Sequence, residues 1–167
     1  MNIWVIILEA LLFAIYFTLN IFVMAKKYKH TPAMIFNYPK DIQEEYFKTH
    51  ERVDVSFKSK KVILAKSVAL LLFTAILFAC SYFAGAKTFL EGFGLTFILM
   101  LWIGLYDTLF IDWVLFANMK MFRLEGTEHM DKEYHQKWFH LKGMLFPGII
   151  FGLIPAVLVG LLIPLIR

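Results

Sequence analysis

Several polar residues lie inside long apolar runs of this sequence, where such groups could do chemistry. Lys66 and Asp107 carry opposite charges, and Asn20 and Tyr106 fall near the same depth of their own runs. Counted at about 1.5 Å per residue, Asn20 lies roughly 9 Å and Lys66 and Asp107 roughly 7.5 Å inside. Ionisable groups are costly in an apolar helix and are therefore candidates for function. The sequence predicts a polar pocket formed by Asn20, Lys66, Tyr106 and Asp107.

The pocket hypothesis includes an ion pair between Lys66 and Asp107. The alternatives are that Lys66 extends its long side chain to the membrane interface and that Asp107 has only a structural role. Asp112 is expected at the interface, because five residues separate it from Asp107. That spacing turns by about 140° on an α-helix, so the two carboxylates are not expected on one face. Glu9 belongs to the opposite leaflet, as a structural or a proton-handling group.

A second group of candidate residues covers or flanks this pocket. Glu128, His129, His135 and His140 combine imidazole and carboxylate groups, which can bind a metal ion. Their spacing matches no recognised metal motif, so a metal at His129 and His135 is a weak hypothesis. Cys80 is the single cysteine, which excludes a disulfide within the chain.

Small residues recur at every fourth position near the end of the chain. Gly148, Gly152, Ala156 and Gly160 form one continuous ridge on a helix. Such ridges allow helix backbones to approach closely in lipid. The ridge predicts helix packing, and the partner is either within the chain or in another subunit.

The composition defines the elements that must position these residues. Apolar and aromatic residues make up 60% of the 167 positions and charged residues 18%, whereas a soluble domain is about 45–50% apolar and about 25% charged. Apolar runs over about 3–25, 62–86, 91–118 and 143–166 are each long enough to cross a bilayer. We expect a single all-α, polytopic membrane domain over 1–167 with four transmembrane helices.

The basic residues predict the orientation of these helices. Fifteen of the seventeen Lys and Arg residues lie in 26–66 and 120–142. The positive-inside rule places segments 26–61 and 119–142 in the cytosol and both termini outside. The composition suits a bacterial cytoplasmic (inner) membrane, and this placement of charge does not indicate nucleic-acid binding.

Each cytosolic segment is expected to contain a short amphipathic helix. Asp41 and Glu44 have the spacing of a capping box, with Ile42 and Tyr46 on one face beyond them. The alternation over 52–57 favours a short extended piece. In the second segment the helical face is predicted to comprise Met130, Tyr134, Trp138 and Leu141. We expect both helices to lie against the headgroups, with Tyr134 and Trp138 as aromatic anchors.

These features favour a small membrane protein that handles a lipid or another amphiphilic molecule in a pocket open to the cytosolic leaflet. The alternatives are a non-enzymatic accessory or scaffold subunit of a membrane complex and a small homo-oligomeric transporter. The plan resembles, in architecture alone, the small four-helix membrane glutathione and eicosanoid enzymes. The Arg- and Asn-bearing motif that this family has on its second helix is not apparent here, and enzymatic activity stays open. The expected partners are membrane lipids, a second copy or a membrane subunit.

Overall fold

The computed structural model of the protein describes residues 1–28, 30–52 and 59–166. Within these ranges every regular element is a helix. Four helical stretches are long and apolar enough to cross a membrane, namely Ile3–Lys27, Lys60–Phe83, Phe89–Phe116 and Asp131–Ile166. An all-helical fold with four such helices is therefore confirmed. The extended piece expected over 52–57 falls almost wholly outside the described residues.

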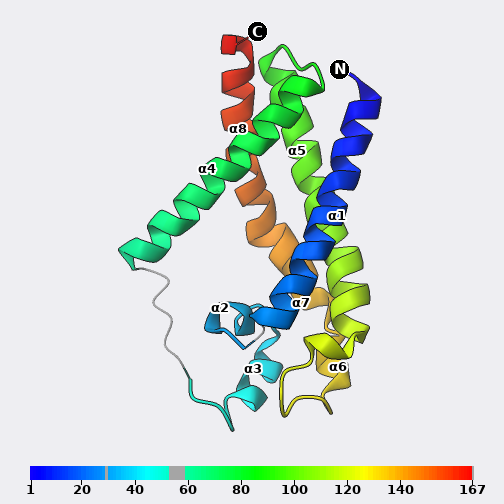
Figure 1. The fold of residues 1–167 in the computed structure, drawn as a ribbon, viewed down its shortest axis with the longest axis vertical. Coiled ribbons are helices and arrows are strands. Elements are labelled where there is room, and N and C mark those ends of the chain that lie inside the picture. The colour runs from blue at the N-terminus through cyan, green and yellow to red at the C-terminus, as the bar shows by residue number, and fades with distance from the viewer. Residues whose placement is uncertain (29, 53–58, 167) are drawn as a thin grey trace.

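The long helices form a bundle, and the shorter ones gather at one end of it (Figure 1). The bundle consists of α1 (Ile3–Lys27), α4 (Lys60–Phe83), α5 (Phe89–Tyr106) with its continuation η1 (Asp107–Phe116), and α8 (Ile149–Ile166). Both chain termini lie at the opposite end of the bundle from the short helices. The short helices are α2 (Pro32–Ile35), α3 (Lys40–Tyr46), η2 (Lys120–Phe122), α6 (Asp131–Tyr134) and α7 (Lys137–Gly143), with η3 (Met144–Gly148) leading into α8.

Local sequence signals define where the long helices begin. The Asn2 and Ser59 side chains accept hydrogen bonds from the first turns of α1 and α4. Thr88 and Glu91 form a complete capping box at the start of α5, which satisfies backbone donors that a helix start leaves free. Between α4 and α5, Gly85 has a φ of +87°. Glycine alone adopts this conformation readily, so the chain can reverse within a few residues.

The most extensive helix pairing joins α5 to α8. Gly152, Ala156 and Gly160 are buried on α8. A Cβ added at Gly160 would lie 3.0 Å from the backbone oxygen of Phe89, and one at Gly152 would lie 3.3 Å from Met100 Cβ. The small residues therefore let α8 approach α5 of the same chain closely. The fourth member of the ridge, Gly148, lies in the bend between α7 and α8 instead.

Helix α4 packs on the bundle through only its second half. Its buried residues are Thr74, Leu77 and Ser81, and the Ser81 hydroxyl lies 3.0 Å from that of Thr96 on α5. The first half, including Lys66, is exposed and leaves the bundle at an angle (Figure 1).

A second core lies at the end of the bundle that carries the short helices. We refer to α2, α3, η2 and α6 with their connecting segments as the cap, and to its buried cluster as the cap core. The cap core comprises Ala25, Ile35, Tyr38, Ile42, Tyr46, Phe116, Phe122, Leu124 and Tyr134. Ala25 and Phe116 belong to α1 and η1, so the ends of two bundle helices anchor the cap. The cap is thus a folded unit with an interior of its own.

The cap core corrects the prediction that Tyr134 is a membrane-interface anchor. Tyr134 is only 1% exposed, and its hydroxyl accepts a hydrogen bond from Leu124 N–H at 2.9 Å. Trp138, the other expected anchor, is 62% exposed. Helical spacing correctly places Tyr134 on an apolar face, but that face is covered by protein.

The single helix expected around residues 130–141 is divided into α6 and α7. The His135 ring nitrogen Nδ1 lies 2.7 Å from the backbone oxygen of Asp131, which is the acceptor that an α-helix would use for the His135 N–H. That N–H bonds instead to Lys132 O. A side chain that competes for a backbone acceptor in this way ends the helix.

The capping box expected at Asp41 and Glu44 does not form. Helix α3 begins at Lys40, and its N-cap residue Pro39 makes no side-chain capping bond. The Asp41 carboxylate instead accepts a hydrogen bond from Gln136 Nε2 at 2.8 Å. Asp41 therefore ties α3 to the connection between α6 and α7.

Candidate functional site

A cavity of about 830 Å³ lies between the bundle core and the cap core. Most of its lining residues are apolar, and they include Phe97, Met100 and Ile103 of α5, Met144 and Phe146 of η3, and Phe151 of α8. The polar lining residues are Asn37, Tyr38, Asp107, Thr108, Asp112, His140 and Lys142. An apolar cavity with a few polar groups gathered in it is the usual form of a small-molecule site.

Three of the polar lining residues, Asp107, Thr108 and Asp112, lie on the unusual helix η1. The segment Asp107–Phe116 is a π-helix, in which each N–H bonds to the carbonyl five residues earlier. The Ala117 N–H, for example, bonds to Asp112 O. Residues five apart therefore come near one another, and both Asp107 and Asp112 line the cavity. The prediction that these carboxylates lie on different faces is wrong, because it assumed α-helical geometry.

His140 on α7 completes this group. Its ring nitrogen Nδ1 lies 3.0 Å from Asp112 Oδ2, and its side chain is only 8% exposed. The other ring nitrogen, Nε2, is buried and has no hydrogen-bond partner in the protein. Asp107 lies within electrostatic range of both Asp112 and His140. We refer to Asp107, Asp112 and His140 as the acidic cluster.

Aromatic residues hold the acidic cluster in place. The His140 ring packs edge-to-face against Phe116, with ring centroids 5.2 Å apart. Phe116 in turn contacts Tyr38 and Tyr134 in the cap core. Burial raises the pKa of Tyr38 above its usual range, with a further contribution from Tyr134. The Tyr38 hydroxyl therefore stays protonated, and it donates a hydrogen bond to Phe122 O at 2.9 Å.

The structure separates the four residues predicted to form the polar pocket. Asp107 lines the cavity. The Tyr106 hydroxyl lies 2.8 Å from that of Thr18 and links α5 to α1. Asn20 is exposed, with its amide 3.3 Å from the Tyr16 hydroxyl. Lys66 is exposed on the first half of α4, the half that leaves the bundle at an angle (Figure 1), and its pairing with Asp107 stays a prediction.

The residues predicted to cover the pocket also separate. His140 joins Asp107 in the cavity wall, whereas Glu128, His129 and His135 are exposed in the cap. Among the described residues, no three His, Cys, Asp or Glu side chains gather closely enough to hold a metal ion. The weak metal hypothesis for His129 and His135 gains no geometric support from this arrangement.

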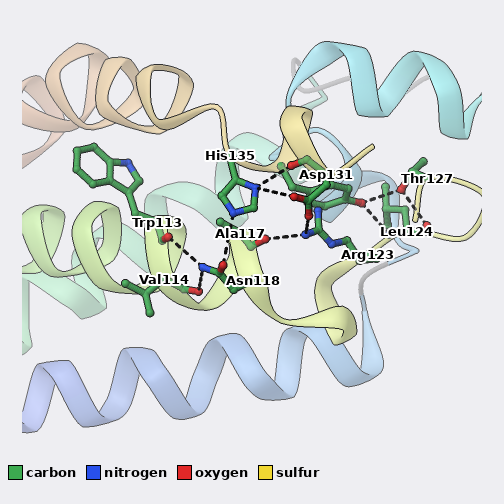
Figure 2. Close-up of polar contacts among 10 residues, drawn as sticks. Trp113, Val114, Ala117, Asn118, Arg123, Leu124, Thr127, Asp131 and His135 are labelled. Atoms are coloured by element: carbon green, nitrogen blue, oxygen red, sulfur yellow. Dashed lines mark hydrogen bonds and ion pairs between the residues drawn. The ribbon is translucent and has the colours of Figure 1, made fainter. Parts of the chain in front are cut away.

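His135 instead belongs to a polar network that fastens the cap to the end of η1 (Figure 2). Its Nε2 lies 3.4 Å from the Asn118 side-chain oxygen. Arg123 donates to Ala117 O and to Asp131 Oδ1, both at 2.7 Å, and its guanidinium lies 3.9 Å above the Tyr134 ring. These contacts join the segment after η1 to α6. Their arrangement indicates a structural role for His135 and Asp131.

Sequence reasoning missed that Asp112 lines the cavity and contacts His140. A carboxylate and an imidazole separated by 28 positions carry no local motif. The only signal was that both lie near the predicted cytosolic ends of apolar runs. That signal fixes a shared depth but not a shared side of the bundle.

No protein-family model, curated protein or solved structure matches this chain.

Proposed function

We propose that this protein is integral to a membrane and binds a lipid or another amphiphilic small molecule in the cavity between the bundle and the cap. The observation that carries the proposal is the lining of that cavity. Its apolar wall suits a hydrocarbon chain, and its acidic cluster suits a polar headgroup. Lining residues Phe97 and Asp112 are fifteen positions apart along α5 and η1. The α-helical part from Phe97 to Asp107 alone spans about 15 Å at about 1.5 Å per residue, which suits an elongated ligand.

Insertion in a membrane is supported by apolar side chains on the outside of the bundle. Trp4, Leu19, Leu72 and Leu165 are each more than 60% exposed, and they come from three different bundle helices. Soluble proteins rarely expose continuous apolar surface on this scale. In the proposed orientation the cap faces the cytosol and both termini face outside. The cavity then opens at the level of the cytosolic leaflet.

Under the scaffold alternative, the ridge of small residues would be the surface that binds a partner subunit. In the structure Gly152 and Gly160 pack against α5 of the same chain, and Ala156 between them is buried. A partner subunit would therefore have to use another surface. This observation favours amphiphile binding over docking through the ridge.

The orientation leads to a labelling prediction. In a Cys80→Ala background, Lys87→Cys is expected to react with a membrane-impermeant thiol reagent in whole cells. Lys132→Cys in α6 is expected to react only after the membrane is permeabilised. Both lysines are exposed, so burial in the protein does not account for the difference. Labelling of Lys132→Cys in intact cells would reverse the orientation.

The binding proposal predicts a ligand that co-purifies with the protein. Native mass spectrometry in a mild detergent is expected to detect a bound amphiphile. Met144→Trp should reduce its occupancy to less than about a tenth, because Met144 lines the cavity and the larger ring fills it. The matched control is Ile98→Trp, at a position that is 60% exposed on α5. Equal occupancy in the two variants would show that the amphiphile binds outside the cavity.

A further inference from the structure

The acidic cluster presents hydrogen-bond acceptors to the cavity. His140 Nδ1 lies 3.0 Å from Asp112 Oδ2, so in a neutral imidazole Nδ1 carries the proton and donates it to this carboxylate. Nε2 is then an acceptor. The protein supplies no hydrogen bond to Nε2, although it is buried. A buried polar group without a partner is costly, so this nitrogen is suited to a donor from a bound ligand.

The charges around the cavity favour the same kind of ligand. Asp107 and Asp112 are two carboxyl groups in one wall, with His140 between the bundle and the cap. Among the described lining residues, the basic side chain besides His140 is Lys142. Its ammonium lies 5.9 Å from the centre of the Trp138 ring, and Trp138 is not among the lining residues. A ligand that brings its own positive charge would complement the two carboxyl groups.

From these observations we infer that the cavity selects an amphiphile with a protonated primary amine as its headgroup. The inference rests on the proposed function and specifies the chemical class of its ligand. An ammonium group offers three N–H donors and one positive charge. It can therefore donate hydrogen bonds to the carboxyl groups of Asp107 and Asp112 in the cavity wall, whereas His140 Nε2, on the far side of the imidazole from Asp112, is a separate acceptor. The hydrocarbon part of the ligand lies along the apolar wall formed by residues such as Phe97, Met100 and Phe151.

The experiment compares four probes that share a twelve-carbon chain: dodecylamine, dodecyltrimethylammonium, dodecanol and dodecanoate. Their binding to the full chain in lipid nanodiscs is measured by native mass spectrometry. Dodecylamine is expected to bind about tenfold or more tightly than each of the others, because charge-assisted hydrogen bonds are the strong ones. Dodecyltrimethylammonium has the charge without a donor, and dodecanol has a donor without the charge.

The outcomes separate this inference from the proposed function. Saturable binding of all four probes with similar affinity, or tightest binding of dodecanoate, would overturn the selection of an amine and leave amphiphile binding intact. Equal binding of dodecylamine and dodecyltrimethylammonium would show that charge alone is recognised and would also overturn it. Failure of every probe to bind would overturn the proposed function and this inference with it.

Variants of the acidic cluster provide a second test. Asp112→Asn and Asp107→Asn are expected to reduce the ratio of dodecylamine to dodecanol affinity about tenfold each, because one carboxylate is lost. Dodecanol binding should change little, which distinguishes recognition from a loss of folding. Lys132→Gln, at an exposed position of α6 outside the cavity lining, serves as the control, and the amine preference should be retained in it. An unchanged ratio in both aspartate variants would exclude the acidic cluster as the amine site.

Discussion

Replacement of Gly160 by leucine is expected to destabilise the bundle by about 3 kcal/mol. A Cβ at this position would lie 3.0 Å from both the backbone oxygen of Phe89 and Phe93 Cβ. Backbone atoms cannot rotate away as a flexible side chain can, so α8 would have to move away from α5. Since this pairing is the most extensive in the molecule, the loss should lower the thermal unfolding temperature in mild detergent substantially.

The matched control for this prediction is Gly94→Leu on α5. A Cβ at Gly94 would meet no atom within 4 Å. The substitution is expected to change stability by no more than about 0.5 kcal/mol, and it gains helix propensity over glycine. Similar unfolding temperatures for Gly160→Leu and Gly94→Leu would show that α8 does not pack against α5 through its small residues.

The second large effect is expected from Tyr134→Ala in the cap. Tyr134 is fully buried, and truncation of a buried aromatic ring costs about 3–5 kcal/mol. The change also removes the hydroxyl that accepts from Leu124 N–H and the ring beneath the Arg123 guanidinium. Hydrogen exchange of backbone amides, measured by mass spectrometry, should become faster throughout the cap. It should remain slow in the half of the bundle that lies near the chain termini.

Two control variants separate the contributions at this position. Tyr134→Phe keeps the ring and leaves Leu124 N–H without its partner, which is expected to cost about 1–3 kcal/mol. Trp138→Ala removes an aromatic ring that is 62% exposed and should change cap exchange very little. If Trp138→Ala accelerated exchange as much as Tyr134→Ala, the assignment of Tyr134 to the cap core would be wrong.

The long helices could be predicted because their signals are local. A run of apolar residues such as the one from Ile3 to Ala25 has the length of a membrane helix whatever surrounds it. The four-residue period of Gly152, Ala156 and Gly160 likewise identifies a close-packing face without reference to the rest of the chain. The partner of that face, α5, was not contained in the pattern.

The candidate site depended on geometry that the sequence pattern does not contain. Asp107 was identified from its position in an apolar run, but its neighbours were predicted from depth along the helices. Depth does not show that the first half of α4 diverges from the bundle. The helix type mattered as much, because Asp107 and Asp112 both line the cavity from a segment that is π-helical. Propensity and periodicity favour α-helix over this rare form.

The π-helix has a consequence for how the two cores are oriented about the helix axis. Each residue of an α-helix advances the side-chain direction by about 100°. Because η1 is a wider helix, its ten residues change the direction in which the side chains after it point. Ile103, before η1, contributes to the bundle core, and Phe116, at its end, contributes to the cap core. The number of residues in η1 therefore acts as an angular spacer between the two cores. A chain one residue shorter there would rotate the cap relative to the bundle and close or displace the cavity between them.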